Sequence, residues 1–232
     1  MSLNKRILHV VTNVNHYEKS DTPTGLWLSE LTHAYDIFEK NGFSQVIISP
    51  LGGIVPLEPR ALKIPYIDLS TYRRYKQKSF MQKLQTTLKP SDVDANQYDA
   101  IFFTGGHGVM WDFPNDAGLQ SLTRQIYENG GIVASVCHGY CGLLNVKTSN
   151  GKFLIQDKKI TGYTWVEEIL AGVMFKVPYN VEKCSKQRGA KFKKGLFPFK
   201  PYVCEDQRIV TGQNPFSTKL TAKIVCRILA SK

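Results

Sequence analysis

Four short apolar runs constrain most strongly how this chain can fold. They are "RILHVV" (Arg6–Val11), "SQVIIS" (Ser44–Ser49), "YDAIFFT" (Tyr98–Thr104) and "GIVASV" (Gly131–Val136). Each run favours β-structure and is apolar nearly throughout, rather than alternating with polar residues. Strands of a parallel sheet that is covered on both faces have this composition. We therefore expect the four runs to be buried strands.

Helical patterns separate these runs. Residues 25–40 place apolar residues at helical spacing and end at Asn41–Gly42, residues 116–130 repeat the pattern and stop at Gly130, and a third helix follows Pro215. Glycine just after a helical pattern is typical of a helix C-terminus. The alternation predicts an α/β fold, with a central, mostly parallel sheet flanked by helices on both faces in a flavodoxin-like sandwich. No repeat or clear linker appears, so we expect a single domain over residues 1–232.

Residues 70–97 interrupt the alternation, because a simple crossover would be shorter. Phe80, Met81, Leu84 and Leu88 have helical spacing in a segment rich in Lys, Gln and Tyr. The pattern predicts an inserted helical cap on the sheet, and such insertions often cover a site. Surface elaboration with no role in the site is the alternative.

Composition limits the partners and the location. The net charge is +11, with basic residues densest at 71–78 and 186–195, but no nucleic-acid-binding module surrounds either segment. We therefore expect a solvated basic surface and no nucleic-acid partner. No apolar stretch reaches the roughly 18 residues of a membrane span, and Asn13 follows the first apolar run too soon for a signal peptide. We expect a cytoplasmic protein with no membrane partner, whose five cysteines, an odd count without a C-x-x-C pair, are free thiols.

A cysteine and a histidine stand side by side where the fourth strand-like run ends. Cys137 and His138 follow Val136, and Gly139 comes next. Ligands of α/β sheets bind at the carboxyl ends of strands, and a nucleophile in a sharp strand-to-helix turn is held exposed there. Nearby helix N–H groups are expected to favour the thiolate form of Cys137. His138 can add proton transfer, and its backbone N–H can donate to an oxyanion.

A second strand end supplies further donors. "GGHG" follows the run Tyr98–Thr104, and the glycines Gly105 and Gly106 allow close backbone approach. We expect the Gly106 N–H to aim at the same oxyanion as the N–H of His138, with Gly105 and His107 also at the substrate. Any one of these pieces alone is explained by turn chemistry, and the two strand ends together are much more specific.

Three motifs together resemble the ThiJ/PfpI superfamily: "GGHGVMWDFP" (105–114), "VCHG" (136–139) and "TGQNPFSTKLTA" (211–222). Within that superfamily the chain is similar to the branch of glutathione-independent glyoxalase III enzymes and heat-shock chaperones. The resemblance covers nearly the whole chain. It implies a cytoplasmic stress-response protein that forms a homodimer in many relatives.

The resemblance also implies roles for individual residues. The nucleophile falls on Cys137 and its histidine on His138. A glutamate near the sulfur falls on Glu30, which follows the "TG" turn at the start of the first helix and is expected to stay protonated beside a thiolate. The third member of the triad falls on Glu168 in "TGYTWVEEI", with Glu167 as a near rival.

Two residues depart from the pattern of the family. Tyr140 stands where proline is usual after "CHG", and Cys141 adds a second thiol within one turn of the nucleophile. We expect Tyr140 to reshape the mouth of the pocket. For Cys141 a resolving thiol and a buried core cysteine remain open.

The function implied is conversion of a small 2-oxoaldehyde such as methylglyoxal to its hydroxy acid, a lyase activity that protects against reactive carbonyls. No cofactor is expected, since neither nicotinamide, metal nor glutathione is needed. A holding chaperone and a cysteine-based oxidative-stress sensor are the alternatives. A cysteine peptidase ranks last, because a cap is expected to exclude large substrates.

Overall fold

The computed structural model describes residues 5–231, and a mostly parallel sheet forms its centre. The order of the strands is β2-β1-β3-β4-β8-β7, and only the edge strand β7 among the described strands runs antiparallel to its neighbour. The strands are β1 (Arg6–Val10), β2 (Ser44–Ile48), β3 (Ala100–Phe103), β4 (Ile132–Val136), β7 (Val203–Asp206) and β8 (Ile209–Gly212). The predicted fold class and all four predicted strands are confirmed.

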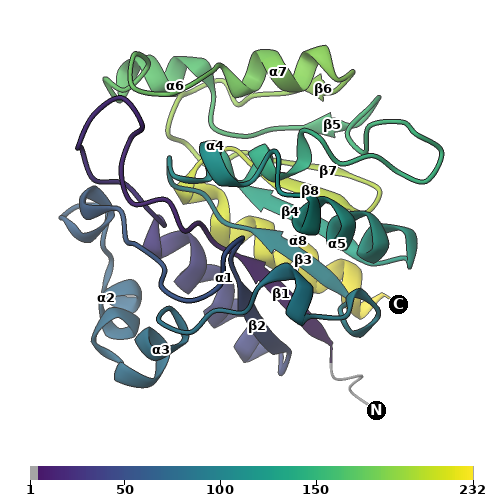
Figure 1. Cartoon of the computed structure of the whole chain (residues 1–232), viewed down its shortest axis with the longest axis horizontal. Helices are drawn as coiled ribbons and strands as arrows, with labels where there is room; N and C mark the ends of the chain where they lie inside the picture. Colours follow the sequence, from purple (N-terminus) through teal and green to yellow (C-terminus); the bar gives the residue numbers. More distant parts are fainter. Residues whose placement is uncertain (1–4, 232) are drawn as a thin grey trace.

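Helices cover both faces of this sheet (Figure 1). The long helices are α1 (Leu28–Lys40) and α8 (Thr218–Ala230), which pack together on one face, and α5 (Ala117–Glu128) on the other. The shorter elements are η1 (Pro59–Leu62), α2 (Leu69–Lys76), α3 (Lys78–Lys83), η2 (Pro90–Asp92), η3 (Ala95–Gln97), α4 (Val109–Asp112), η4 (Cys137–Leu143), β5 (Lys159–Ile160), α6 (Trp165–Leu170), α7 (Val181–Gln187), β6 (Lys191–Phe192) and η5 (Pro215–Ser217). Within residues 5–231, none of the helices has both the length and the apolarity to cross a bilayer.

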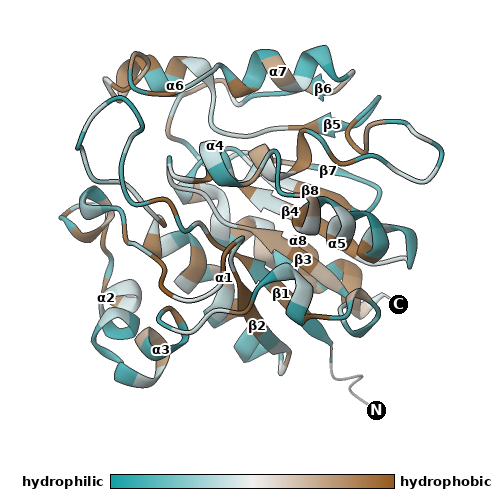
Figure 2. Cartoon of the chain, viewed as in Figure 1, coloured by the Kyte–Doolittle hydropathy of each residue, from teal (hydrophilic) through white to brown (hydrophobic). Residues whose placement is uncertain are grey.

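Alternate residues of β3 point into two hydrophobic layers, as the period of a strand requires. Ile101 and Phe103 pack with Leu119 of α5, whereas Phe102 packs with Phe38 of α1 on the opposite face. Figure 2 shows the hydrophobic colour gathered in the central strands β1 and β3. The apolar runs of the sequence are therefore continuous because the strands are buried on both sides.

The first helix begins three residues later than its pattern predicts. Gly25 has a φ of 156°, and the N–H of Leu26 donates to the carbonyl oxygen of Pro56, so the chain stays extended until Trp27. Glu30 consequently lies in the first turn of α1 rather than its second. Because the helix starts later, the carboxyl of Glu30 lies near the N-terminal end of α1.

The inserted segment is helical, but it does not border the pocket described below. α2 and α3 lie beside α1 (Figure 1), and Phe80 and Leu84 are buried against it. Leu88 lies outside α3, forms a bridge with Ile48 and is 42% exposed, so its predicted place on the helix is wrong. Among the described residues that line the pocket, none comes from 70–97. The expected exclusion of large substrates by this segment is therefore not supported.

Candidate active site

Two neighbouring strand ends bring the candidate residues together. Phe103 of β3 pairs with Ser135 of β4 in parallel register, so Gly105 and Cys137 follow at the same edge of the sheet. Cys137 has a φ of 56°, a left-handed conformation that costs a non-glycine residue about 1–2 kcal/mol. A Cβ on Gly139 would lie 2.4 Å from the carbonyl oxygen of Phe103, so the elbow requires glycine there. The strained turn that the sequence predicts is present.

His138 lies between the thiol and a carboxylate. Its Nδ1 is 3.3 Å from Sγ of Cys137, and its Nε2 is 2.6 Å from Oε1 of Glu168, in the first turn of α6. All three side chains are buried. A carboxylate only accepts hydrogen bonds, so Nε2 carries the ring proton and Nδ1 is left free to accept from the thiol. The thiol, the imidazole and the carboxylate therefore stand in the order that covalent catalysis would need.

The neighbouring glutamate has a structural role. Oε1 of Glu167 accepts hydrogen bonds from the N–H of Phe199 and from the side-chain amides of Gln213 and Asn214. Its Oε2 accepts from the backbone N–H and the hydroxyl of Thr164, the N-cap of α6. Glu167 therefore ties the "TGQNP" segment and the backbone at Phe199 to α6, and the carboxylate that reaches His138 belongs to Glu168.

The carboxylate of Glu168 is held in its charged form. Burial opposes ionisation, but the charge of His138 and the hydrogen bonds from His107 and His138 outweigh burial and keep the pKa of Glu168 well below its ordinary value. Its second oxygen, Oε2, accepts from Nε2 of His107 at 3.1 Å. Two imidazoles thus share one carboxylate.

Glu30 approaches Cys137 from α1 and is fully buried. Its Oε2 accepts the N–H of Gly105 at 2.6 Å, while Oε1 has no hydrogen bond of ordinary geometry within the described residues. Burial raises the pKa of Glu30 to about 8, against the opposing contributions of the Gly105 N–H and of Cys137. Near neutral pH the carboxyl therefore carries a proton, which can sit on Oε1 and face the sulfur.

The predicted preference for the thiolate is wrong for the resting site. Burial first, and the Glu30 carboxyl second, raise the pKa of the Cys137 thiol well above its ordinary value, although the N–H of His138 acts in the opposite direction. The element after the elbow is the short 3₁₀ helix η4, not a long α-helix with a full dipole. The thiol would therefore need a base to remove its proton before it could act as a nucleophile.

The two glycines of the "GGHG" loop make different contacts. The N–H of Gly105 is donated to Glu30, so Gly105 is removed from the predicted oxyanion donors. Gly106 lines the pocket, and a Cβ there would lie 2.0 Å from the carbonyl oxygen of Gly25. Its φ of 107° also favours glycine. The N–H groups of Gly106 and His138 remain the candidates for binding an oxyanion.

His107 belongs to the same buried network. Its Nε2 meets Glu168, and its Nδ1 lies 3.1 Å from Nη2 of Arg60. Burial, the charge of His138 and, more weakly, Arg60 lower the pKa of His107 to about 4, despite the hydrogen bond and charge of Glu168. Arg60 could not be recognised as a site residue from the sequence, because it is 47 residues from His107 and belongs to no motif.

A divalent cation could in principle bridge part of this network. One ligand atom each from His107, His138 and Glu168 lie within 4.8 Å of one another. The Nε2 atoms of both imidazoles, however, donate their protons to Glu168, so the lone pairs that a metal needs are not presented. The chemistry of this donor set fits a proton network.

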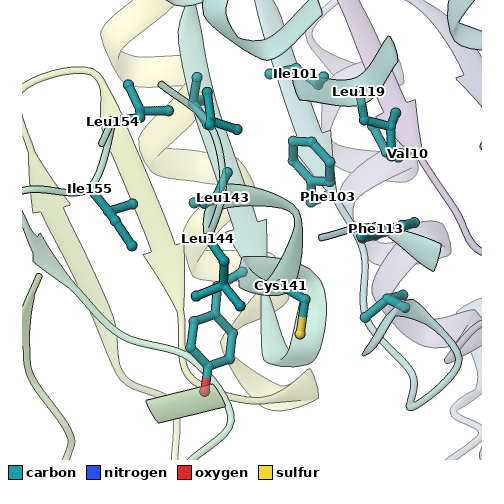
Figure 3. Packing of buried hydrophobic residues seen from close by; sticks show 14 of the residues in the cluster. Val10, Ile101, Phe103, Phe113, Leu119, Cys141, Leu143, Leu144, Leu154 and Ile155 are labelled. Carbon is teal, nitrogen blue, oxygen red and sulfur yellow. The ribbon is translucent and has the colours of Figure 1, made fainter. Parts of the chain in front are cut away.

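Both departures from the family pattern lie away from the pocket. Tyr140 is buried, its hydroxyl donates to the carbonyl oxygen of Tyr163, and its ring packs against Gly162. The expectation that it reshapes the pocket mouth is therefore wrong. Cys141 belongs to the core cluster with Phe113 and Leu144, as Figure 3 shows. It is a core cysteine in this structure and does not line the site.

A cavity of about 540 Å³ opens over Cys137. His107, His138 and Gly106 also line it, so the candidate groups are reachable from one space. Its other lining residues include aromatic and aliphatic side chains and two cations, namely Trp27, Tyr66, Leu170, Phe199 and Phe216 with Arg60 and Lys63. The pocket therefore combines apolar walls with a few convergent polar groups, as sites for small molecules usually do.

A model of the DJ-1/PfpI family matches residues 24–225. This chain belongs to the DJ-1/PfpI family. The DJ-1/PfpI match spans every site residue described above, from Glu30 to Glu168.

Relatives of known name are similar over almost their whole length. Glutathione-independent glyoxalase HSP31 of Saccharomyces cerevisiae is 35% identical over 228 residues, 94% of this chain and 95% of that protein. Among solved structures, Rapid Encystment Protein 24 KDa of Francisella tularensis has a TM-score of 0.92 at 36% identity, covering 97% of this chain and 99% of that one. Glyoxalase III from Candida albicans has a TM-score of 0.89 at 29% identity, covering 96% of each. The similarity of this DJ-1/PfpI chain to these proteins therefore includes its sequence as well as its fold.

Proposed function

We propose that this protein is a glutathione-independent glyoxalase that converts methylglyoxal, or a similar small 2-oxoaldehyde, to the corresponding hydroxy acid. The contact of 3.3 Å between Sγ of Cys137 and Nδ1 of His138 carries the proposal, because Glu168 fixes the imidazole in the tautomer that can accept the thiol proton. The similar proteins of Saccharomyces cerevisiae and Candida albicans are named as glyoxalases, which supports the same activity.

The first step is addition of the thiol to the aldehyde. Nδ1 of His138 takes the thiol proton while the sulfur of Cys137 bonds to the aldehyde carbon, whose C=O electron pair moves to oxygen. The N–H groups of Gly106 and His138 stabilise that oxyanion, which then receives the proton from His138. The product is a hemithioacetal on Cys137, and His138 is neutral again. Coupling proton transfer to addition suits a thiol whose pKa is raised.

The second step moves hydrogen between the two carbons. Neutral His138 removes the proton from the former aldehyde carbon, the electron pair passes through an enediol, and a proton is returned to the neighbouring carbon. Protonated Glu30 can donate to the sulfur or to the developing enediol and recover its proton afterwards. The first carbon is oxidised to a thioester while its neighbour is reduced to an alcohol, so the electrons balance within the substrate.

Hydrolysis completes the cycle. Water attacks the thioester carbon with His138 as the base, the C–S bond breaks, and Cys137 leaves as a thiol after taking a proton. The net reaction adds one water to methylglyoxal and gives lactate. No hydride donor, glutathione or external oxidant enters this balance, which agrees with the expected absence of a cofactor requirement. The reaction places the enzyme in the lyase class.

The direct test is to incubate the purified protein with methylglyoxal, without glutathione, and to measure lactate. We expect cofactor-independent production of lactate that fails in Cys137→Ala. A folded protein that yields no lactate and does not consume the aldehyde would overturn the proposal.

A holding chaperone is the second candidate, favoured by one observation. Ile64, Phe175 and Leu196 are each more than 85% exposed, and large apolar side chains on a surface can bind unfolded chains. Suppression of the aggregation of a model substrate should then survive Cys137→Ala, because it does not need the thiol. Loss of both activities in that variant would argue against this candidate.

A further inference from the structure

Arg60 is a cation that the proposed chemistry does not use, yet it is firmly held at the edge of the pocket. Its Nε lies 2.9 Å from Oε1 of Glu58, and its Nη2 lies 3.0 Å from Oε2 of the same carboxylate. Glu58 is 1% exposed and also accepts a hydrogen bond from the hydroxyl of Thr24. A two-point contact between guanidinium and carboxylate fixes orientation as well as charge.

The same guanidinium nitrogen faces His107. Nη2 of Arg60 lies 3.1 Å from Nδ1 of His107 and 2.8 Å from the hydroxyl of Tyr17, so its two hydrogens are shared among three acceptors. Arginine has no lone pair to offer and stays charged in proteins. Nδ1 of His107, which faces Nη2 of Arg60, must therefore be unprotonated, whichever of the two Nη2 hydrogens points toward it.

This contact and the Glu168 carboxylate together set the direction of the hydrogen bonds through His107. With Nδ1 of His107 bare, the ring proton lies on Nε2 and is donated to Oε2 of Glu168. The other oxygen of Glu168 accepts from Nε2 of His138, whose Nδ1 is then free for the proton of Cys137. A continuous and polarised chain thus runs from Glu58 and Arg60 to the sulfur.

We infer that Arg60 is a positioning residue that holds His107 as the neutral Nε2–H tautomer and so preserves Glu168 as the charged acceptor for His138. This inference deepens the proposed function and rests on it only for the readout of activity. The tautomer itself is a property of the resting protein.

The surroundings of His107 show what Arg60 adds to burial, which is the largest influence against a second proton on that ring. Removing the cation would let His107 take a second proton, because an imidazolium would pair with Glu168 only 3.1 Å away. Such an ion pair would weaken Glu168 as the partner of His138. Lowering of the pKa of His107 by Arg60, in addition to burial and His138, agrees with this role. The titratable groups in direct contact with His107 are Arg60, Tyr17, Tyr163, His138 and Glu168. Three further charged groups lie one step away: Glu58 pairs with Arg60, Lys63 lines the pocket, and Lys176 lies over the ring of Tyr17.

The test combines nitrogen NMR of the imidazoles with pH–rate profiles. The variants are Arg60→Met, Arg60→Lys and the pair Glu58→Gln/Arg60→Met, which leaves no buried carboxylate without its partner. Arg74→Met is the matched control, since Arg74 is also held by carboxylates, here Asp36 and Glu39, but lies on α2 away from the site. His107→Gln assigns the resonances.

In the parent protein and in Arg74→Met, we expect His107 to remain the neutral Nε2–H tautomer down to about pH 5, consistent with a pKa of about 4. In Arg60→Met and in the double variant, we expect His107 to protonate at least one pH unit higher. The acid limb of kcat/KM for methylglyoxal should move by the same amount, which is about tenfold in rate per pH unit below the limb. Arg60→Lys should fall in between.

An unchanged tautomer and midpoint of His107 in folded Arg60→Met and in the double variant would overturn the inference. A shifted His107 in a protein that does not act on methylglyoxal would support the inference and refute the proposed function. A shifted His107 with an unmoved acid limb in an active enzyme would show that Arg60 does not act through Glu168, and would overturn that part of the inference.

Discussion

Glu30 and Glu168 make an instructive pair, because two buried carboxyls serve one sulfur in opposite protonation states. Glu30 accepts one backbone N–H through Oε2, and its Oε1 has no hydrogen bond of ordinary geometry within residues 5–231; burial raises its pKa to about 8. Glu168 is almost as deeply buried, yet two imidazoles donate to its two oxygens and its pKa is held well below the ordinary value. The number and charge of the donors, more than the depth of burial, decide which carboxyl ionises.

The difference assigns complementary tasks to the two sides of the site. The Glu30 side can donate a proton near neutral pH, whereas the Glu168 side can only accept and orient. A pair of similar groups with pKa values pushed apart is the arrangement that acid–base chemistry requires. Single substitutions of Cys137, His138, Glu168 and Glu30 test whether the two carboxyls have these different roles.

The largest loss of activity should follow removal of the Cys137 sulfur, which lies between Glu30 and the His138–Glu168 pair. Cys137→Ala should reduce production of lactate from methylglyoxal to background, because Cys137 is the only thiol among the described residues that line the pocket. Cys141→Ala is the matched control, since Cys141 lies in the core outside the pocket, and it should keep its activity. Equal activity of Cys137→Ala and the parent would remove the covalent mechanism.

The base on the Glu168 side should come next. His138→Ala should lower kcat by about 100- to 10,000-fold, the usual contribution of a general acid–base. Steady-state kinetics with methylglyoxal at pH 7 measure this. A loss below tenfold would mean that another group, with Glu30 as the first suspect, carries the proton.

Glu168→Gln should lower kcat less than His138→Ala does, because Glu168 orients and polarises the imidazole of His138 without touching the substrate. Glu167→Gln is its neighbour control: Glu167 bonds Phe199, Gln213 and Asn214, so we expect it mainly to lower the free energy of unfolding, by about 1–3 kcal/mol for a buried charged acceptor. Kinetics and urea unfolding of both variants separate the two roles. The reverse order of the two losses of activity would make Glu167 the partner of His138.

The smallest effect on activity, and a clear effect on stability, should follow Glu30→Gln. The pKa of Glu30 rises from about 4.5 in the unfolded chain to about 8 when folded, so its contribution to stability is complete below pH 4.5 and is lost as the pH rises toward and through 8. The free energy of unfolding of the variant should therefore fall less over this range, by up to about 1.4 kcal/mol per pH unit.

Urea unfolding between pH 5 and pH 9 tests that expectation, and Asp112→Asn provides the control. Burial also raises the pKa of Asp112, to about 7, so this variant should flatten the pH profile of stability in the same way. Only Glu30→Gln should alter how the reactivity of the Cys137 thiol depends on pH. Superimposable thiol profiles for Glu30→Gln and the parent would separate Glu30 from the sulfur.

Much of the fold could be predicted because burial on both faces leaves a local signal. The runs that became β1, β3 and β4 are apolar nearly throughout, the edge strand β2 is apolar only after Gln45, and α5 and α8 show one apolar face each. The strands β7 and β8 were missed. β7 lies at the edge of the sheet and mixes exposed and buried positions, so neither a continuous apolar run nor a clear alternation marks it.

The site was predictable only where it is local in the sequence. The elbow at Cys137 and the close approach at Gly106 follow from residue types that tolerate or favour sharp turns. Glu167 and Glu168 could not be separated, because adjacent positions on a helix point in different directions and only the packing of α6 determines which one meets His138. Arg60 left no local signal at all.

The sequence by itself determined the alternation of the first four sheet strands with helices, the place of Cys137 at a strand end and the glycines that its turn needs. These depend on short-range sterics and on the periodicity of apolar residues. The tertiary structure alone decided the protonation of Cys137, the choice of Glu168 and the contact of Arg60 with His107, whereas the protonated state expected for Glu30 agrees with its raised pKa. Protonation depends on desolvation and on charges within a few ångströms, and folding brings those charges together from positions far apart in the chain.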